Sequence, residues 1–194
     1  MKSNGIELVT DSEVYPPSED TYLLLDAIEI GPSDTFLEIG CGSGLLSVAA
    51  ARIAQKVVAT DISLRAMRNT QENLVRNALD HRCSVIQSDL LSALDPKSKF
   101  SVIAFNPPYL PKDEHTTDMD RVLVGGKVGV EITERFLREV RGYLQSQGSV
   151  YVVASSLADV ERVEAAMLKN GLRVKRQATK KLFFETLQVL RGTL

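Results

Sequence analysis

Short apolar segments alternate with longer amphipathic segments along most of the chain. In an α/β protein each strand leads through a helix to the next strand, so this alternation predicts a mainly parallel sheet. Seven segments have the length and composition of strands, namely residues 35–39, 57–61, 84–87, 102–105, 149–154, 172–177 and 186–190. Five segments have helical character, namely residues 18–30, 45–54, 63–77, 130–144 and 158–170.

Residues that are typical of helix ends support several of these boundaries. Ser18 is a suitable N-cap for the first helix, Gly31 and Pro32 follow its end, and Gly171 has the position of a C-cap glycine. No helix separates the last two strand segments, which residues 178–185 join, so we expect an antiparallel hairpin at the end of an otherwise parallel sheet. Residues 112–126 lack a clear period, which is typical of a functional or mobile loop.

The composition excludes several classes of protein. With 23 Lys and Arg residues against 25 Asp and Glu residues, the net charge of −2 argues against a wholesale nucleic-acid binder. Two cysteines make no disulfide framework, and the two histidines lack metal-ligand spacing with them, so no metal centre is predicted. No apolar run approaches the ~18 residues that span a bilayer, and the N-terminus has no signal-peptide pattern. We expect residues 1–194 to form a single domain in the cytoplasm.

A glycine-rich loop follows the first strand and opens a helix. Gly40, Gly42 and Gly44 have the spacing G-x-G-x-G, whereas a dinucleotide site would require a glycine at the position of Leu45. Glycines let the backbone turn tightly and approach a ligand closely. Glu38, two residues before the first glycine, can contact an ammonium group of the ligand, which a pyrophosphate site would not favour.

Carboxylates also follow the next two strands. Asp61 ends the second strand and can accept hydrogen bonds from both hydroxyls of a ribose. Asp89 follows the third strand, where it can accept from the exocyclic amine of an adenine while Leu90 packs on the ring. Three successive strand ends would then face one crevice, although ordinary turns with solvated acids remain the alternative.

This combination resembles the class I S-adenosylmethionine-dependent methyltransferases. The resemblance implies a Rossmann-like α/β fold: a seven-stranded, mostly parallel sheet with an antiparallel last strand and helices on both faces. It also implies S-adenosyl-L-methionine as the cofactor, S-adenosyl-L-homocysteine as the product, and a cofactor contact from Ile62 beside Asp61.

The most distinctive motif is Asn106-Pro107-Pro108-Tyr109, directly after the apolar strand 102–105. Two prolines fix φ at both positions and stiffen the loop. The Asn106 side-chain oxygen and the Pro107 carbonyl can then accept the two N–H bonds of a planar NH₂ group, while the Tyr109 ring packs on its face. A plain Pro-Pro turn is the alternative.

The motif resembles that of the amino-methyltransferases that modify adenine N6, cytosine N4 or glutamine Nδ. Three further stretches, residues 14–21, 125–131 and 184–190, resemble segments of the eukaryotic and archaeal, HemK-like glutamine N5-methyltransferases that act on class I release factors. The resemblance therefore implies methyl transfer to the glutamine side-chain amide of a release factor's Gly-Gly-Gln loop. Asn106 would also contact the cofactor, and Thr21 would lie near its carboxylate end, within a segment 1–34 that covers the cofactor site.

The resemblance implies a partner as well. Family members commonly work as heterodimers with a small zinc-binding activator protein. Bacterial relatives carry an N-terminal helical domain that recognises the release factor, and here only 34 residues precede the first strand. We therefore expect a partner protein instead.

Other interpretations stay open. A methyltransferase acting on adenine or cytosine in DNA or RNA would need a flipped base and a basic track; a protein lysine methyltransferase and a non-catalytic binding module are further alternatives. Cys41 is interpreted as an apolar filler, and Arg135, Arg138 and Arg141 as a solvated face. Glu19 and Asp20 fit either first-turn helix charges or a cofactor lid.

Overall fold

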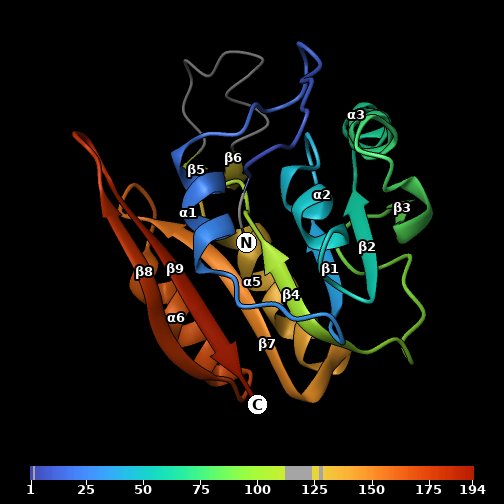
Figure 1. The fold of residues 1–194 in the computed structure, drawn as a ribbon. Coiled ribbons are helices and arrows are strands. Elements are labelled where there is room, and N and C mark those ends of the chain that lie inside the picture. Colours follow the sequence, from blue (N-terminus) through green and yellow to red (C-terminus); the bar gives the residue numbers. More distant parts are fainter. Residues whose placement is uncertain (2, 112–123, 127–128) are drawn as a thin grey trace.

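The computed structural model describes residues 1, 3–111, 124–126 and 129–194 (Figure 1). Seven strands form one sheet in the order β3-β2-β1-β4-β7-β9-β8. Their bounds are β1 (Thr35–Ile39), β2 (Lys56–Asp61), β3 (Cys83–Gln87), β4 (Phe100–Phe105), β7 (Leu144–Ser155), β8 (Arg173–Lys181) and β9 (Thr186–Thr193). Strand β9 is antiparallel to both neighbours, and the other described strand pairs of this sheet are parallel. The predicted fold class is thereby confirmed.

Helices cover both faces of the sheet. Helices α1 (Glu19–Ala27), α2 (Leu45–Ala51) and α3 (Leu64–Arg76) contribute to one core, and α5 (Glu131–Val140) and α6 (Val160–Lys169) to the other. Side chains alternate between the two cores along β1, where Phe36 belongs to the first and Leu37 to the second. Both are fully buried, because a sheet covered on both faces has no solvated side.

Local sequence explains several helix ends. The Ser63 hydroxyl accepts a hydrogen bond from the Ala66 amide at the start of α3, and Asp159 caps α6 through the Arg162 amide. Gly171 follows α6 with a φ of +77°, as the predicted C-cap glycine requires. Ser18 precedes α1, and its own amide donates to the Thr21 hydroxyl at 3.4 Å.

Several predicted boundaries are wrong. Helix α5 ends at Val140, a 3-10 turn η2 (Arg141–Tyr143) follows, and Leu144 already belongs to β7, where it pairs with Phe100. Helix α1 ends at Ala27, before the Gly-Pro stop, and α2 ends at Ala51. Strand β8 continues to Lys181, which shortens the predicted hairpin connection. At Leu144 and along β8, strand pairing overrides local propensity.

Several short elements complete the description. They are the 3-10 turn η1 (Asp80–Arg82) and the strands β5 (Leu110–Pro111) and β6 (Val124–Gly126), which pair in parallel. Most of the loop predicted over residues 112–126 lies outside the described residues. Within the described part of the chain, no helix combines the length and the apolar character needed to cross a membrane.

Candidate active site

A cavity of about 490 Å³ opens at the carboxyl ends of the central parallel strands, where open α/β sheets bind their ligands. Most residues predicted for the site line it; they are Thr21, Glu38, Gly40, Gly42, Asp61, Ile62, Asp89, Leu90, Asn106, Pro107 and Pro108. Gly44 and Tyr109 are not in its lining. Residues from five separate parts of the sequence therefore meet in one place.

Asp61 is held by the glycine loop and by the start of α3. Its Oδ2 accepts a hydrogen bond from the Gly42 amide at 3.0 Å, and its Oδ1 accepts one from the Ser63 amide at 2.8 Å. Burial raises the pKa of Asp61, and these backbone donors oppose the increase. The carboxylate is thus fixed at the edge of the cavity, with its orientation set by backbone on both sides.

Gly44 has a packing role in this structure. Its φ is +79°, and a Cβ atom there would lie 2.8 Å from both Oγ1 and Cγ2 of Thr70 on α3. Only glycine combines that backbone conformation with such a close approach. Gly44 therefore lets α2 begin against α3, and its predicted contact with the cofactor stays a prediction.

Glu38 is a buried carboxyl group in the wall of the cavity. It is 4% exposed and accepts a hydrogen bond from the Ser47 hydroxyl. Burial raises the pKa of Glu38 to about 8, the Ser47 hydrogen bonds oppose this, and the nearby Asp61 charge adds to it. A carboxyl group in this position favours a cationic ligand group, because a positive charge would compensate its desolvation.

The third strand end carries an ion pair that the sequence did not predict. Arg135, on α5, bonds to Oδ1 of Asp89, and both side chains line the cavity. Leu90 has a φ of +52°, which is unusual for a leucine. The Ser88 hydroxyl stabilises this turn, since it donates to the Leu90 carbonyl at 2.9 Å and accepts from the Ala93 amide at 3.1 Å.

Asn106 presents an unused acceptor at the end of β4. Its Oδ1 is buried and has no hydrogen-bond partner among the described residues. A buried amide oxygen without a partner costs about 1–3 kcal/mol, so its place in a cavity wall points to a ligand donor. Phe105, the preceding residue, packs edge-to-face on Phe136 with ring centroids 5.0 Å apart and anchors the strand end.

The double glycine of β6 packs against this loop. A Cβ atom at Gly125 would lie 2.2 Å from the Pro108 carbonyl oxygen and 2.3 Å from that of Gly129. Both are backbone atoms, so a side chain at this position would displace the Asn-Pro-Pro backbone. The small sheet of β5 and β6 therefore depends on glycine at this contact.

Tyr109 is buried beside the cavity without lining it. Its side chain is 8% exposed, and its hydroxyl donates to Oδ2 of Asp20 at 3.3 Å. The Tyr15 hydroxyl donates to the same oxygen at 3.4 Å, while Oδ1 of Asp20 accepts from the Thr21 amide and hydroxyl at 2.6 and 3.1 Å. Packing of the Tyr109 ring on a substrate stays a prediction; in this structure the ring joins a core cluster.

Asp20 is therefore a shared acceptor for three segments, the N-terminal segment, α1 and the loop after β4. It is 2% exposed and also lines the cavity. Burial and the Asp20 charge raise the pKa of Tyr15 to about 12 and raise the pKa of Tyr109 as well. Both tyrosines accordingly stay protonated and act as donors at neutral pH.

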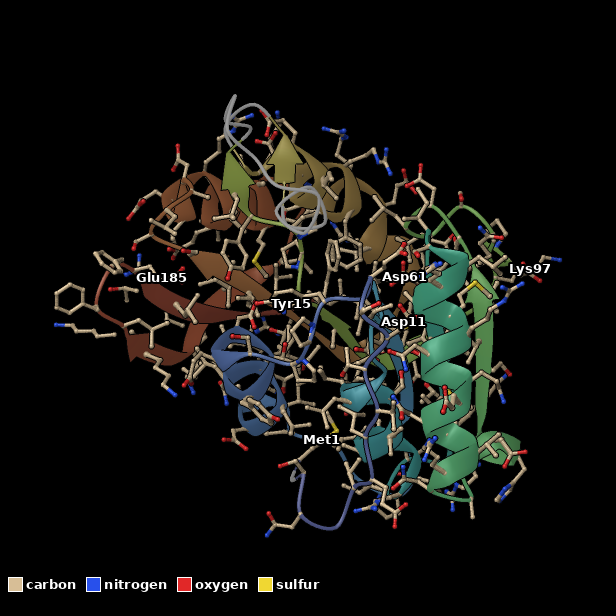
Figure 2. All side chains as sticks on the ribbon, turned by 90° about the horizontal axis from the view of Figure 1, so that it is seen from above. Met1, Asp11, Tyr15, Asp61, Lys97 and Glu185 are labelled. Atoms are coloured by element: carbon tan, nitrogen blue, oxygen red, sulfur yellow. The ribbon has the colours of Figure 1, made fainter. Side chains whose placement is uncertain are left out.

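The N-terminal segment supplies another wall. Glu13, Val14, Tyr15 and Pro17 line the cavity, and Val14 is 4% exposed. Viewed from above, the segment passes from Met1 along α3 at Asp11 and then turns over the site to Tyr15 (Figure 2). The sequence predicted such a cover from the resemblance of residues 14–21; it gave no indication of what holds residues 7–11 in place.

The fold and this constellation define a methyltransferase. The family model described as methyltransferase small domain matches residues 7–187, and the chain belongs to that family. A putative protein N5-glutamine methyltransferase of Methanocaldococcus jannaschii is 37% identical over 98% of this chain and 96% of its own length. Methyltransferase HEMK2 of Homo sapiens is 33% identical over 94% of this chain and 90% of its own.

A solved structure has the same fold. It is the Mtq2 protein of E. cuniculi in complex with Trm112, described as responsible for methylation of the translation termination factor eRF1. The superposition gives a TM-score of 0.75 at 24% sequence identity and covers 93% of this chain and 98% of the other. At this identity the likeness concerns the fold.

Proposed function

We propose that the protein transfers a methyl group from S-adenosylmethionine to the side-chain amide nitrogen of a glutamine in a class I peptide-chain release factor. The observation that carries this proposal is the buried Oδ1 of Asn106 in the cavity wall, for which the described part of the chain offers no hydrogen-bond partner. The M. jannaschii relative, which matches nearly the whole chain, is named as a putative protein N5-glutamine methyltransferase.

The residues in the cavity fit the cofactor. When bound, S-adenosylmethionine supplies an activated methyl group on a sulfonium sulphur. The buried Glu38 carboxyl would bind its ammonium group, and Asp61 would accept hydrogen bonds from the ribose hydroxyls. Asp89 would accept from the adenine amine while Leu90 packs on the ring. Thr21 and Ile62 also border the cavity and complete the proposed contacts.

Asn106 and Pro107 would hold the substrate amide. The Asn106 Oδ1 accepts one N–H of the glutamine side chain, and the Pro107 carbonyl accepts the other. Two acceptors on one NH₂ group orient the nitrogen and increase its electron density. As the nitrogen gains the methyl group, one of its protons is released to water. Rate enhancement comes from orientation and preorganised electrostatics, so no general base is required before attack.

A hairpin beside the site supports a protein substrate. Strand β8 runs parallel to β7, so the β8–β9 connection lies at the end of the sheet where the parallel strands finish and the cavity opens. This connection exposes Phe183 and Phe184 to 92 and 84%, and their rings pack edge-to-face. Exposed aromatic pairs are typical of protein interfaces. We propose that they contact the release factor around the glutamine loop.

The proposal also includes a partner protein and a cellular compartment. The E. cuniculi relative forms a complex with Trm112, and we propose that this chain also binds a small, zinc-binding activator as a heterodimer. We further propose that residues 1–194 form one methyltransferase domain that works in the cytoplasm, with residues 1–34 covering the cofactor.

Transfer of a labelled methyl group tests the proposal. The protein, with and without a Trm112-type activator, is incubated with radiolabelled S-adenosylmethionine and a class I release factor. We expect label on the glutamine of the Gly-Gly-Gln loop, located by mass spectrometry, and none on a release factor with Gln→Ala there. Equal labelling of that variant would overturn the glutamine assignment. Labelling of a lysine, or of DNA or RNA in parallel reactions, would favour the corresponding alternative.

A further inference from the structure

Three asparagines on α3 and at its end bind the backbone of the N-terminal segment. The Oδ1 atoms of Asn77, Asn73 and Asn69 accept hydrogen bonds from the amides of Glu7, Val9 and Asp11 at 3.1, 2.9 and 3.1 Å. Their Nδ2 groups donate in return: Asn77 to the Glu7 carbonyl, and both Asn73 and Asn69 to the Val9 carbonyl, at 2.7–2.8 Å. We call residues 7–11 the strap and the three asparagines the ladder.

The spacing of the ladder matches that of an extended chain. Side chains four positions apart on a helix lie about 6.0 Å apart along its axis. Alternate residues of an extended strand lie about 6.6 Å apart. The helix therefore presents one amide to every second residue of the strap. Each asparagine carries a donor and an acceptor, as a peptide group does, so α3 pairs with the strap much as a neighbouring strand would.

The same face of α3 also binds the glycine loop. Asn73 Nδ2 donates to the Ser43 carbonyl at 2.8 Å, and the Thr70 hydroxyl donates to the Gly42 carbonyl at 3.0 Å. Asn73 is fully buried and Asn69 is 4% exposed, so these hydrogen bonds are shielded from water. One buried polar face thus connects two walls of the cavity, the glycine loop and the segment that continues from the strap to Val14 and Tyr15.

We propose that Asn69, Asn73 and Asn77 are positioning residues for the cofactor. The ladder holds the strap in register on α3, and the register of the strap sets where Val14 and Tyr15 close the cavity. This inference rests on the proposed function, because it takes S-adenosylmethionine as the ligand. Without the ladder, the cover would fluctuate away from the glycine loop, and bound cofactor would dissociate faster.

Calorimetric titration with S-adenosylmethionine tests the ladder from the helix side. We expect Asn73→Ala to raise the cofactor Kd about tenfold, and Asn69→Ala, which loses fewer bonds, to raise it by a smaller factor. In turnover, the KM for the cofactor should rise more than kcat falls. The matched control is Asn170→Ala at the end of α6, which also removes an asparagine-to-backbone hydrogen bond but touches no cavity wall; it should leave Kd unchanged.

A variant of the strap tests the same pairing without altering α3. Val9→Pro removes the amide N–H from which Asn73 Oδ1 accepts a hydrogen bond, and Val9 is 41% exposed. We expect the same direction of change in Kd, and an effect in the Asn73→Ala background clearly smaller than in the wild type. Thr10→Pro is the control, because no hydrogen bond from the Thr10 amide to a described residue is present.

The outcomes separate this inference from the proposed function. If the wild-type protein binds S-adenosylmethionine and the ladder and strap variants bind it equally well, the ladder has no positioning role. If those variants lose thermal stability in parallel with Asn170→Ala while Kd stays constant, the asparagines are purely structural and the inference is overturned. If the wild-type protein itself binds no cofactor, the proposed function fails, whatever the variants do.

Discussion

The hydroxyl of Tyr109 donates a hydrogen bond to Oδ2 of Asp20 across 3.3 Å, although 89 positions separate the two residues in the sequence. This contact fastens the loop after β4 to helix α1. Tyr15 donates to the same carboxylate, so the cofactor cover and the proposed substrate clamp share one acceptor. The position of Asn106 therefore depends on a carboxylate that lies outside the Asn-Pro-Pro-Tyr motif.

Asp20→Asn should destabilise the protein. An amide keeps only one of the two acceptor oxygens, so its NH₂ group would face either the two tyrosine hydroxyls or the amide and hydroxyl of Thr21, and those donors would lose their acceptor. We expect a loss of about 2 kcal/mol, which lowers Tm by roughly 4–8 °C for a chain of this size. Glu19→Gln is the control, since among the described residues the Glu19 carboxylate pairs with Lys180 alone, at an exposed position. Equal melting temperatures for Asp20→Asn and the wild type, measured by calorimetry, would contradict this role.

Asn106→Ala should separate binding from turnover. The variant removes the acceptor proposed for the substrate amide but leaves Glu38 and Asp61 in place. We expect kcat for methyl transfer to fall by at least about a hundredfold, a loss comparable to that of a preorganised hydrogen-bonding group in an active site. The cofactor Kd, measured by calorimetry, should change less than about threefold. Residual turnover close to that of the wild type would refute the amide clamp.

Gly125→Ala should impair catalysis through the backbone of the Asn-Pro-Pro loop. The new Cβ would meet the Pro108 carbonyl at 2.2 Å, so the loop or β6 must shift. We expect kcat to fall at least tenfold, because small misplacements of a positioning group are costly. Gly142→Ala is a matched control, since a Cβ there has no neighbour within 4 Å. Comparable activity of the two variants would exclude a positioning role for Gly125.

Glu38 should make stability depend on pH. Because its pKa is raised from 4.5 to about 8 in the folded protein, the protonated form is favoured by folding. The stabilisation of the folded state that comes from protonated Glu38 is fully present below pH 4.5 and is lost as the pH rises toward 8. We therefore expect Glu38→Gln to be more stable than the wild type at pH 9, with a smaller difference at pH 5.

Melting curves of the two proteins between pH 5 and pH 9 check this prediction. Because the Asp61 charge raises the pKa of Glu38, the difference between the two proteins reports on Glu38 together with its coupling to Asp61. Parallel curves would show that Glu38 does not titrate in this range. At pH 9 the variant should bind S-adenosylmethionine more weakly despite its greater stability, as expected where a group is kept for binding at a cost in stability.

The sequence predicted the strands better than the helix ends. Buried parallel strands such as residues 102–105 read as continuous apolar runs, which made them easy to locate. The antiparallel pair β8 and β9 was also located, although β8 is mostly exposed and basic. Residues 144–148 were missed because their side chains are mainly polar; Leu144 pairs with Phe100 of β4, and the next registered pair is Val102 with Ser149. That pairing is a long-range effect that no local pattern reports.

The polar residues around the site were harder to interpret. The strand-end acids and the Asn-Pro-Pro loop could be located from spacing, because strand order alone brings strand ends together. Asn69, Asn73 and Asn77 look like a solvated helix face, since the pattern of asparagines at helical spacing does not reveal a partner 58 to 70 positions away. Arg135 was assigned to solvent for the same reason.

The position of β9 bears on how the chain folds. Although β9 is the last strand in sequence order, it lies between β7 and β8 and not at the edge. During synthesis from the N-terminus, β8 has no neighbouring strand to pair with until β9 has been made. Until then the basic residues of β8 stay unpaired and exposed to solvent, and their positive charges discourage pairing with other chains. Completion of the sheet, and of the β8–β9 hairpin that carries Phe183 and Phe184, is therefore a late event in folding.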